Sequence, residues 1–314
     1  MFLFVFVLLS SDVDVSAQPR PDPPLAEVIK KASEARKLYE QSFKDLLTTE
    51  TKTFKIFDKK GSLKKTRTVK SIFMVYQSAD ERNDSVEFRN VIMVDGKPVK
   101  DADARAQGLF ENISKSTSAE AELRRLDSES QRFDPDIFLN GLTLYESVAL
   151  HEKLRPCLEF IILGHEAVDG ADTIVIGYSQ IKPCPGILTD PRKLPTTREF
   201  TILYDAGLPS GTNANEHLSG KLWIDPGTFQ LRREFRSMKV QPGGYTQPTP
   251  LAETEFNYRP SEFGIMTPVR IEHRLWTLLD DKKTARKDAD VIFEYDKFTK
   301  PNVEVKSGDV STSN

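Results

Sequence analysis

The chain has 314 residues, of which 38% are hydrophobic and 29% are charged, which is enough apolar material for a globular protein with a substantial core. Its 44 Lys and Arg residues nearly balance its 47 Asp and Glu residues, and the formal net charge is -3. This balance excludes the large basic surface that holds a phosphate backbone, so we expect no nucleic-acid partner.

The first residues follow the pattern of a secretory signal. An apolar run from Phe2 to Leu9 is too short to cross a bilayer, and Val15-Ser16-Ala17 offers a small-residue cleavage site. We predict a signal peptide over 1–17, although no Lys or Arg precedes the run, and export to the periplasm as a protein that is soluble or peripheral to the envelope. No cysteine follows the cleavage site and no later stretch is long and apolar, so we expect no lipid anchor and no transmembrane segment after signal removal.

After signal removal we expect a proline-rich leader at 18–24, a single domain at 25–306 and a loose polar tail at 307–314. The domain begins with an amphipathic helix from Leu25 to Leu47, whose apolar side should pack on a sheet.

Strands follow at 48–57, 64–77 and 86–94, with turns at Asp58-Lys59-Lys60-Gly61 and Asp95-Gly96-Lys97-Pro98. The region at about 101–133 is charged and helical, with few apolar residues; it is either a solvated helix or an exposed lid. Asp134 before Pro135 is a helix-entry signal and predicts a further helix to about Leu150.

The two cysteines flank a predicted hairpin. Apolar strands at 158–163 and 174–178 are separated by a turn expected around Gly170-Ala171, and if Asp169 faces Asp172, Cys157 lies opposite Cys184. This register and an oxidising compartment predict a disulfide, and the alternative is two unrelated reduced thiols. Neither cysteine has a C-x-x-C partner for catalytic thiol chemistry.

The second half of the chain is rich in strands. Strands are expected near 198–204, 220–224, 229–240, 252–258, 267–276 and 291–298. The hairpin around Asp225-Pro226-Gly227-Thr228 should set Leu222 and Ile224 beside Phe229 and Leu231, with Trp223 on a largely solvated face beside the following residues: Lys221, Gln230 and Arg232.

Short connections between about ten strands predict a mainly β (α+β) protein, with a curved antiparallel sheet or incomplete β-barrel and helices packed on or closing its concave face. Several strands are apolar on both faces, so an apolar cavity is one possibility and burial of both faces under helices is the other. The candidate cavity residues are Phe73, Val75, Ile92, Val94, Phe160 and Ile162.

The segment from Gly220 to Thr228 resembles a hairpin of bacterial outer-membrane lipoprotein-sorting proteins, relatives of the LolA/LolB carriers. Segments at 58–65, 94–99, 163–170 and 268–272 occur in the order expected for this group, over roughly 45–300. The resemblance implies an incomplete β-barrel closed by helices over an apolar cavity that receives acyl chains. The insertion at 101–133 and the lack of a segment that aligns with a lipoprotein-transfer determinant depart from the group.

No catalytic pattern stands out. The histidines are dispersed and form no metal-ligand spacing, and neither a G-x-S-x-G elbow nor a phosphate-binding glycine loop occurs. We therefore expect no catalytic residues, no metal and no cofactor. Two hypotheses remain: an envelope protein, carrier or sensor, that binds a lipid acyl chain or a lipoprotein, and a non-enzymatic interaction module with a filled core. The oligomeric state stays open.

Overall fold

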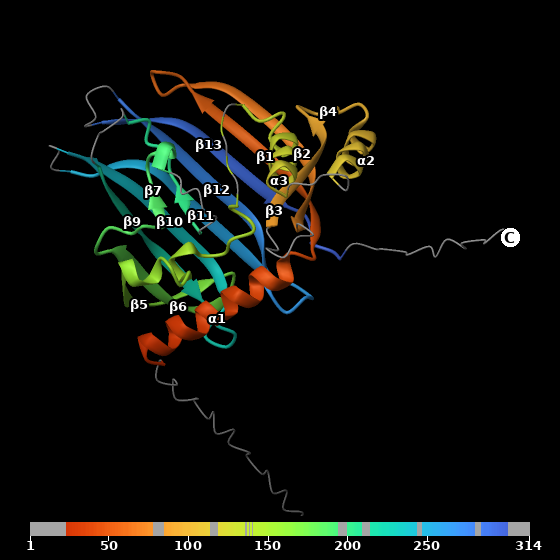
Figure 1. The fold of residues 1–314 in the computed structure, drawn as a ribbon. Coiled ribbons are helices and arrows are strands. Elements are labelled where there is room, and N and C mark those ends of the chain that lie inside the picture. The colour runs from red at the N-terminus through yellow and green to blue at the C-terminus, as the bar shows by residue number, and fades with distance from the viewer. Residues whose placement is uncertain are drawn as a thin grey trace, which may run out of the picture.

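One large antiparallel sheet forms the protein in the computed structural model, which describes residues 23–77, 85–113, 119–135, 137, 139, 141–193, 200–208, 214–243, 247–279 and 284–300. Eleven strands lie in the order β4-β3-β2-β1-β13-β12-β11-β10-β9-β6-β5. The sheet is curved and is not closed into a barrel (Figure 1). The predicted fold class is therefore confirmed.

The strands of the first half are β1 (Leu47–Phe57), β2 (Leu63–Gln77), β3 (Ser85–Val94), β4 (Lys97–Pro98), β5 (Leu158–Val168) and β6 (Ala171–Gln180). Those of the second half are β9 (Ala214–Ile224), β10 (Leu231–Pro242), β11 (Thr249–Pro260), β12 (Met266–Leu278) and β13 (Ala285–Tyr295). A separate parallel pair joins β7 (Ile187–Leu188) to β8 (Ile202–Leu203). The helices are α1 (Leu25–Phe43), α2 (Ala102–Ile113), α3 (Ala119–Ser130) and the short 3-10 helices η1 (Val148–Leu150), η2 (Arg155–Cys157) and η3 (Pro191–Lys193).

Tight turns place most of these strands next to their sequence neighbours. Asp95 and Gly96 have φ values of 49° and 76°, and Asp169 and Gly170 have 50° and 77°. Positive φ at both central residues is the geometry of the hairpin turn that matches strand twist, and Asp-Gly is its favoured sequence. The ends of the described chain also meet, because β1 pairs with β13.

Helix α1 crosses the open lower side of the sheet in Figure 1. Its buried side chains recur every three or four residues, as an amphipathic helix requires: Val28, Ile29, Ala32, Ser33, Arg36, Tyr39 and Phe43. The ring of Phe43 lies 6.1 Å from that of Phe73 in β2 and 5.1 Å from that of Phe298. The helix ends at Phe43 rather than at Leu47, because Leu47 pairs with Met74 and Thr299 at the start of β1.

Helices α2 and α3 lie within the charged region predicted at 101–133; each has an exposed side, and the other side packs on the outer face of β3 and not over the concave face. They pack against β3, and Leu126 of α3 is fully buried beside Phe88. The hydroxyl of Ser130 accepts a hydrogen bond from the backbone N–H of Arg89 at 3.0 Å. The two helices therefore cover one edge of the sheet.

Two secondary-structure predictions are wrong. Residues 134–147 form no helix where they are described, and only η1 follows them. This stretch is instead held by contacts to the sheet, which replace helical hydrogen bonds. The strand expected near 198–204 is reduced to β8, and its residues up to 199 lie outside the described part of the chain.

Candidate functional site

The concave face of the sheet is mostly apolar, with a few buried charged side chains set among the apolar ones. Side chains from β1, β2, β6, β9, β11 and β13 join a single core cluster, which includes Phe54, Phe73, Ile176, Leu222, Phe256 and Phe293. All of these side chains are buried. An apolar surface of this extent must be covered either by the protein itself or by a ligand.

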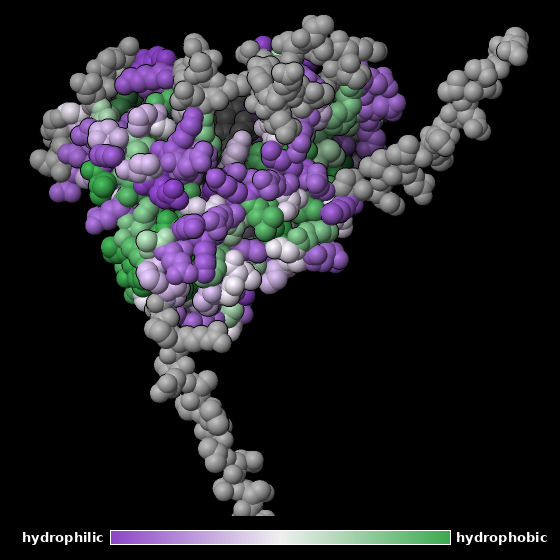
Figure 2. All heavy atoms as spheres, turned by 60° about the horizontal axis from the view of Figure 1, so that its bottom comes forward, coloured by the Kyte–Doolittle hydropathy of each residue, from purple (hydrophilic) through white to green (hydrophobic). Residues whose placement is uncertain are grey.

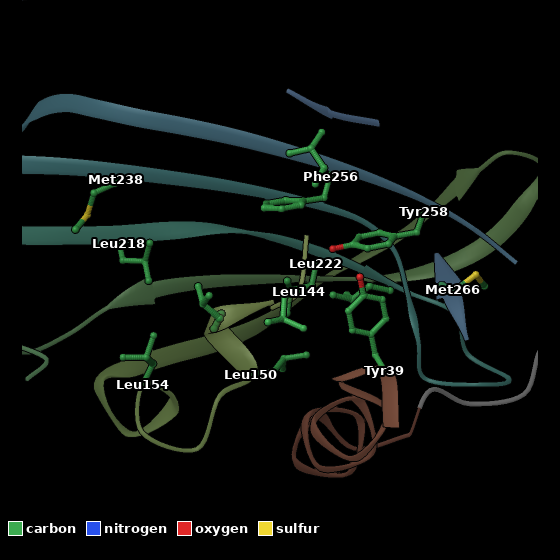
Figure 3. Close-up of a cluster of buried hydrophobic side chains, with 14 of the residues drawn as sticks. Tyr39, Leu144, Leu150, Leu154, Leu218, Leu222, Met238, Phe256, Tyr258 and Met266 are labelled. Carbon is green, nitrogen blue, oxygen red and sulfur yellow. The ribbon is translucent and has the colours of Figure 1, made fainter. Parts of the chain in front are cut away.

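Two segments outside the sheet lie over the concave face: helix α1 and residues 141–157. We call these two segments together the cover. Figure 3 shows Tyr39 of α1 pointing at Tyr258 of β11, with Leu144 and Leu150 directed toward the strands. The rings of Tyr39 and Tyr258 meet edge to face with centroids 6.4 Å apart. The cover is joined to the concave face by side chains and isolated backbone groups, because none of its residues belongs to a strand of the sheet.

A buried ion-pair network ties the cover to the β3 end of the sheet. The guanidinium of Arg89 pairs with Glu50 at 2.7 Å and with Glu87 at 2.9 Å. Glu87 in turn accepts hydrogen bonds from the backbone N–H groups of Thr143 and Leu144, at 2.7 and 2.8 Å. Burial opposes the charge on Arg89, but the two carboxylates hold the pKa of its guanidinium above its ordinary value.

A second polar cluster lies under the cover at the other end. Glu234 of β10 is fully buried and accepts bonds from Arg236 at 3.1 Å and from the hydroxyl of Tyr178 at 3.4 Å. Tyr178 reaches it across Gly220, where an added Cβ would come within 2.5 Å of the tyrosine hydroxyl. A glycine is therefore required at 220.

This second cluster is incompletely bonded. Glu234 Oε2, Arg236 Nη2 and Arg36 Nε are buried and have no hydrogen-bond partner among the described residues. A buried polar group without a partner costs about 1 to 3 kcal/mol. The contact between the cover and this part of the sheet thus includes polar groups that gain no hydrogen bond, whereas Glu87 Oε1 accepts two backbone hydrogen bonds from the cover.

Glu146 belongs to the same cluster. Its side chain is only 3% exposed, and burial raises the pKa of its carboxyl group to about 8, with Glu234 adding to the rise and Arg36 opposing it.

The sequence analysis did not predict these buried charged residues. One signal was present in β1, because Glu50 and Lys52 share strand parity with buried Phe54 and so must face inward with it.

The predicted disulfide is confirmed. Cys157 and Cys184 are joined, with Cα atoms 5.6 Å apart, and the bond fastens the end of the cover to the chain that follows β6. The predicted register is wrong, however. The turn is Asp169-Gly170, Val168 pairs with Ala171, and a bulge at Ile162 and Gly164 shifts the ladder. The cysteines therefore meet just beyond the ladder, because both chain ends leave the hairpin on the same side.

The candidate cavity residues fall into three groups. Phe73, Val75, Val94 and Phe160 belong to or pack against the core on the concave face. Ile92 is half-buried at an irregularity in the pairing of β2 with β3. Ile162 is 38% exposed in the edge strand β5. The structure thus packs four of the six against the core, while Ile162 pairs with the core residue Ile176 but stays partly exposed at the sheet edge, and Ile92 has no partner in β2.

The prediction that Trp223 faces away from Leu222 and Ile224 is confirmed, but the prediction that its face is solvated is wrong. Trp223 lies on the face opposite Leu222 and Ile224, yet it is only 4% exposed. It packs with Val168 and Val175 in a small outer cluster. Its indole N–H donates to Glu166 at 2.7 Å, and Arg233 lies 4.7 Å from its ring. Strand β9 is buried on both sides only near Trp223, where Val168 and Val175 pack against the indole ring and Arg233 lies over it. Phe229, predicted to pair with the strand, instead sits in the turn at φ 58°.

Among the described residues, two surface hollows lie away from the concave face. One, of about 320 Å³, lies on the outer side of β5, β6 and β9, between Ile161 and Leu163 on one side and Lys221 on the other, above Gly177. The other, of about 430 Å³, lies on α2 and α3 near Leu109 and Arg125. Figure 2 shows hydrophobic side chains gathered on the side of the molecule where Figure 1 places β5 and β6.

Within the described residues, no group of His, Cys, Asp and Glu is arranged to hold a metal ion. No helix among them is both long and apolar enough to span a membrane. His273 is buried and its Nδ1 lies 2.7 Å from the hydroxyl of Thr254, and burial lowers its pKa to about 3. Burial thus favours the neutral imidazole of His273.

No protein-family model and no curated protein matches the chain. Among solved structures, it is similar to a protein from Vibrio parahaemolyticus described as an outer membrane lipoprotein-sorting protein domain, at 10% identity and a TM-score of 0.35, covering 89% of this chain and 95% of that one. A DUF1329 family protein from Desulfovibrio piger matches at 10% identity and a TM-score of 0.31, covering 93% and 96%. A LolA superfamily protein from Nitrosomonas europaea matches at 11% identity and a TM-score of 0.30, covering 89% and 94%.

Proposed function

We propose that the protein is an exported cell-envelope protein that binds a lipid or an acylated ligand on the concave face of its sheet, as a carrier or a sensor and not as an enzyme. In this proposal the cover is displaced when the ligand binds, and acyl chains take the place of its apolar side chains. Signal removal after Ala17 and a periplasmic location belong to the same proposal.

The observation that supports it most is the nature of the contact between cover and sheet. Apolar side chains of one core cluster extend across the concave face, from Phe73 in β2 to Leu222 in β9, with the two buried polar clusters set among them. The segments that bury it contribute no strand to the sheet, and part of their contact consists of incompletely bonded polar groups. Methylene groups of an acyl chain would regain about 0.8 kcal/mol each on the exposed apolar surface.

A second function is favoured by a different observation. In this structure the concave face is filled, and two neighbouring apolar side chains on the outer side of β5 reach solvent: Ile161 is 52% and Leu163 48% exposed. An interaction module with a filled core would use such a surface for a protein partner. The two functions therefore place the binding surface on opposite faces of the sheet.

Fluorescent fatty-acid binding, with displacement by phospholipid or lipopeptide, tests the proposal. We expect micromolar binding that changes little with salt, because burial of methylene groups drives it. Native mass spectrometry of protein purified from an envelope-containing host should also find co-purified lipid.

The matched control is the double variant Ile161→Ser and Leu163→Ser, which removes the outer apolar side chains and leaves the concave face intact. Binding that survives in this variant supports the concave site. Binding that disappears moves the site to the outer face, and a complete absence of lipid binding in the parent protein favours the interaction module.

A further inference from the structure

One buried carboxyl group sits where the cover meets the concave face. Glu146 lies in the cover, next to Ser147 and η1, and it is 3% exposed. Its neighbours in the cover, Tyr145 and Val148, pack against or within the core, so the cover shields most of Glu146 from water while it stays in place. Displacement of the cover would expose it.

The charged groups that act on Glu146 come from three elements. Helix α1 contributes Arg36, Glu40 and the hydroxyl of Tyr39; β10 contributes Glu234, and β11 contributes the hydroxyl of Tyr258. Arg36 is already paired with Glu40, and Arg236 is paired with Glu234. Glu146 is therefore a third acid beside two acid–base pairs, and no arginine is reserved for it.

This environment favours the neutral acid. Burial and Glu234 raise the pKa of Glu146 to about 8 against the opposing effect of Arg36, whereas the ordinary value is 4.5. In the closed form the cover lies on the sheet, and in the open form it is displaced. Between pH 4.5 and about 8, Glu146 is protonated in the closed form and ionised in the open form. Opening then releases a proton, so the ratio of open to closed protein rises with pH by up to about tenfold per unit, and it levels off above about pH 8.

We propose that the protonation of Glu146 controls the cover: the neutral carboxyl group keeps α1 and residues 141–157 on the sheet, and loss of its proton opens the concave face, so that apolar ligands bind more tightly as pH rises. This inference rests on the proposed function, because it assigns a regulator to the same site. It adds that the site responds to the pH of its compartment.

The first measurement is hydrogen exchange of the α1 amides in the parent protein from pH 6 to 9, corrected for the intrinsic pH dependence of exchange. We expect protection to fall by about tenfold per pH unit up to pH 8 while the central strands stay protected. The second is the affinity for N-phenyl-1-naphthylamine, an apolar probe that is uncharged in this range. Its apparent affinity should rise in parallel, since it scales with the fraction of open protein.

Glu146→Gln keeps the size of the side chain and removes its titration. In this variant neither the protection of the α1 amides nor the affinity for the probe should change with pH. Glu152→Gln, in the same segment but with a side chain that is 64% exposed, should keep both pH dependences. Flat α1 protection in the parent protein, or a pH dependence that persists in Glu146→Gln, overturns the inference; the parent series decides this even if the variant does not fold.

The two proposals fail in different ways. A probe that never binds, together with α1 protection that falls with pH, contradicts the lipid-binding function and leaves the role of Glu146 standing. A probe that binds with the same affinity at every pH, with constant α1 protection, supports the binding function and contradicts the role of Glu146.

Discussion

At one edge of the sheet, β3 is covered by β4, α2 and α3, whereas at the other edge β5 has no neighbouring strand within the described part of the chain. At the covered edge, the backbone N–H of Arg89 in β3 donates a hydrogen bond to the hydroxyl of Ser130 in α3. The open edge presents Ile161, Ile162 and Leu163 to solvent and is interrupted by a bulge. A bulge limits the addition of another strand at an exposed edge.

The difference shows how an insertion changes a sheet. The region at 101–133 supplies the apolar side chains, such as Leu126, that bury the outer face of β3, so aromatic Phe88 is fully buried there. No such insertion covers β5, and the outer face of β6 and β9 is sealed only locally around Trp223. Substitutions at the two edges should therefore have unequal costs.

The largest loss is expected at the covered edge. Arg89→Ala leaves Glu50 and Glu87 buried without their partner, which should lower the free energy of unfolding by about 3 to 5 kcal/mol. Urea unfolding measures this. Arg270→Ala, which breaks an exposed pair with Glu294, is the control and should cost no more than about 1 kcal/mol. Equal losses would mean that the network at β3 is not desolvated.

Trp223→Ala should come next, at about 3 kcal/mol or more, because it empties the outer cluster of β9. Trp223→Phe keeps most of the ring and loses the hydrogen bond to Glu166, so it should cost less. If both variants unfold at the urea concentration of the parent protein, the indole ring is solvated and the open edge is less sealed than described.

Ser130→Ala tests the closure of the β3 edge by α3. It removes the acceptor for the backbone N–H of Arg89 and should cost about 1 to 3 kcal/mol. Ser128→Ala, in the same helix on its outer surface, is the matched control and should be nearly neutral. A neutral Ser130→Ala would show that water replaces the hydroxyl and that α3 does not seal this edge.

The smallest change is expected at the open edge. Ile161→Thr together with Leu163→Thr places β-branched residues, which strands favour, at both positions and removes apolar groups that are already exposed, so the loss should stay within about 1 kcal/mol. The same pair should lower binding of a surface-sensitive dye. A loss as large as that of Trp223→Ala would show that these side chains are buried in solution, for example by a second copy of the chain.

Much of the fold follows from local chemistry. Asp-Gly turns, the Asp225-Pro226-Gly227-Thr228 turn and the alternation along the strands predicted most of the hairpins, because backbone φ and side-chain parity depend on a few adjacent residues. The cysteine pairing was predicted correctly even though the register was not, since both residues lie just outside one hairpin. By contrast, residues 134–147 have helix-entry chemistry, yet contacts to Glu87 hold them in another conformation.

Parity by itself determined which side chains share a face, and only the tertiary structure decided which faces are covered. Trp223 and Lys221 share the outer face as predicted, but burial of Trp223 depends on Glu166 and Arg233 from neighbouring strands. Glu50 and Lys52 share the face of Phe54, but their burial depends on Arg89, Asp134 and the cover. The pKa of Glu146 likewise depends on α1 and β10, which are distant in sequence. Covering a face requires segments that the local pattern does not specify, and for that reason the candidate site became visible only in three dimensions.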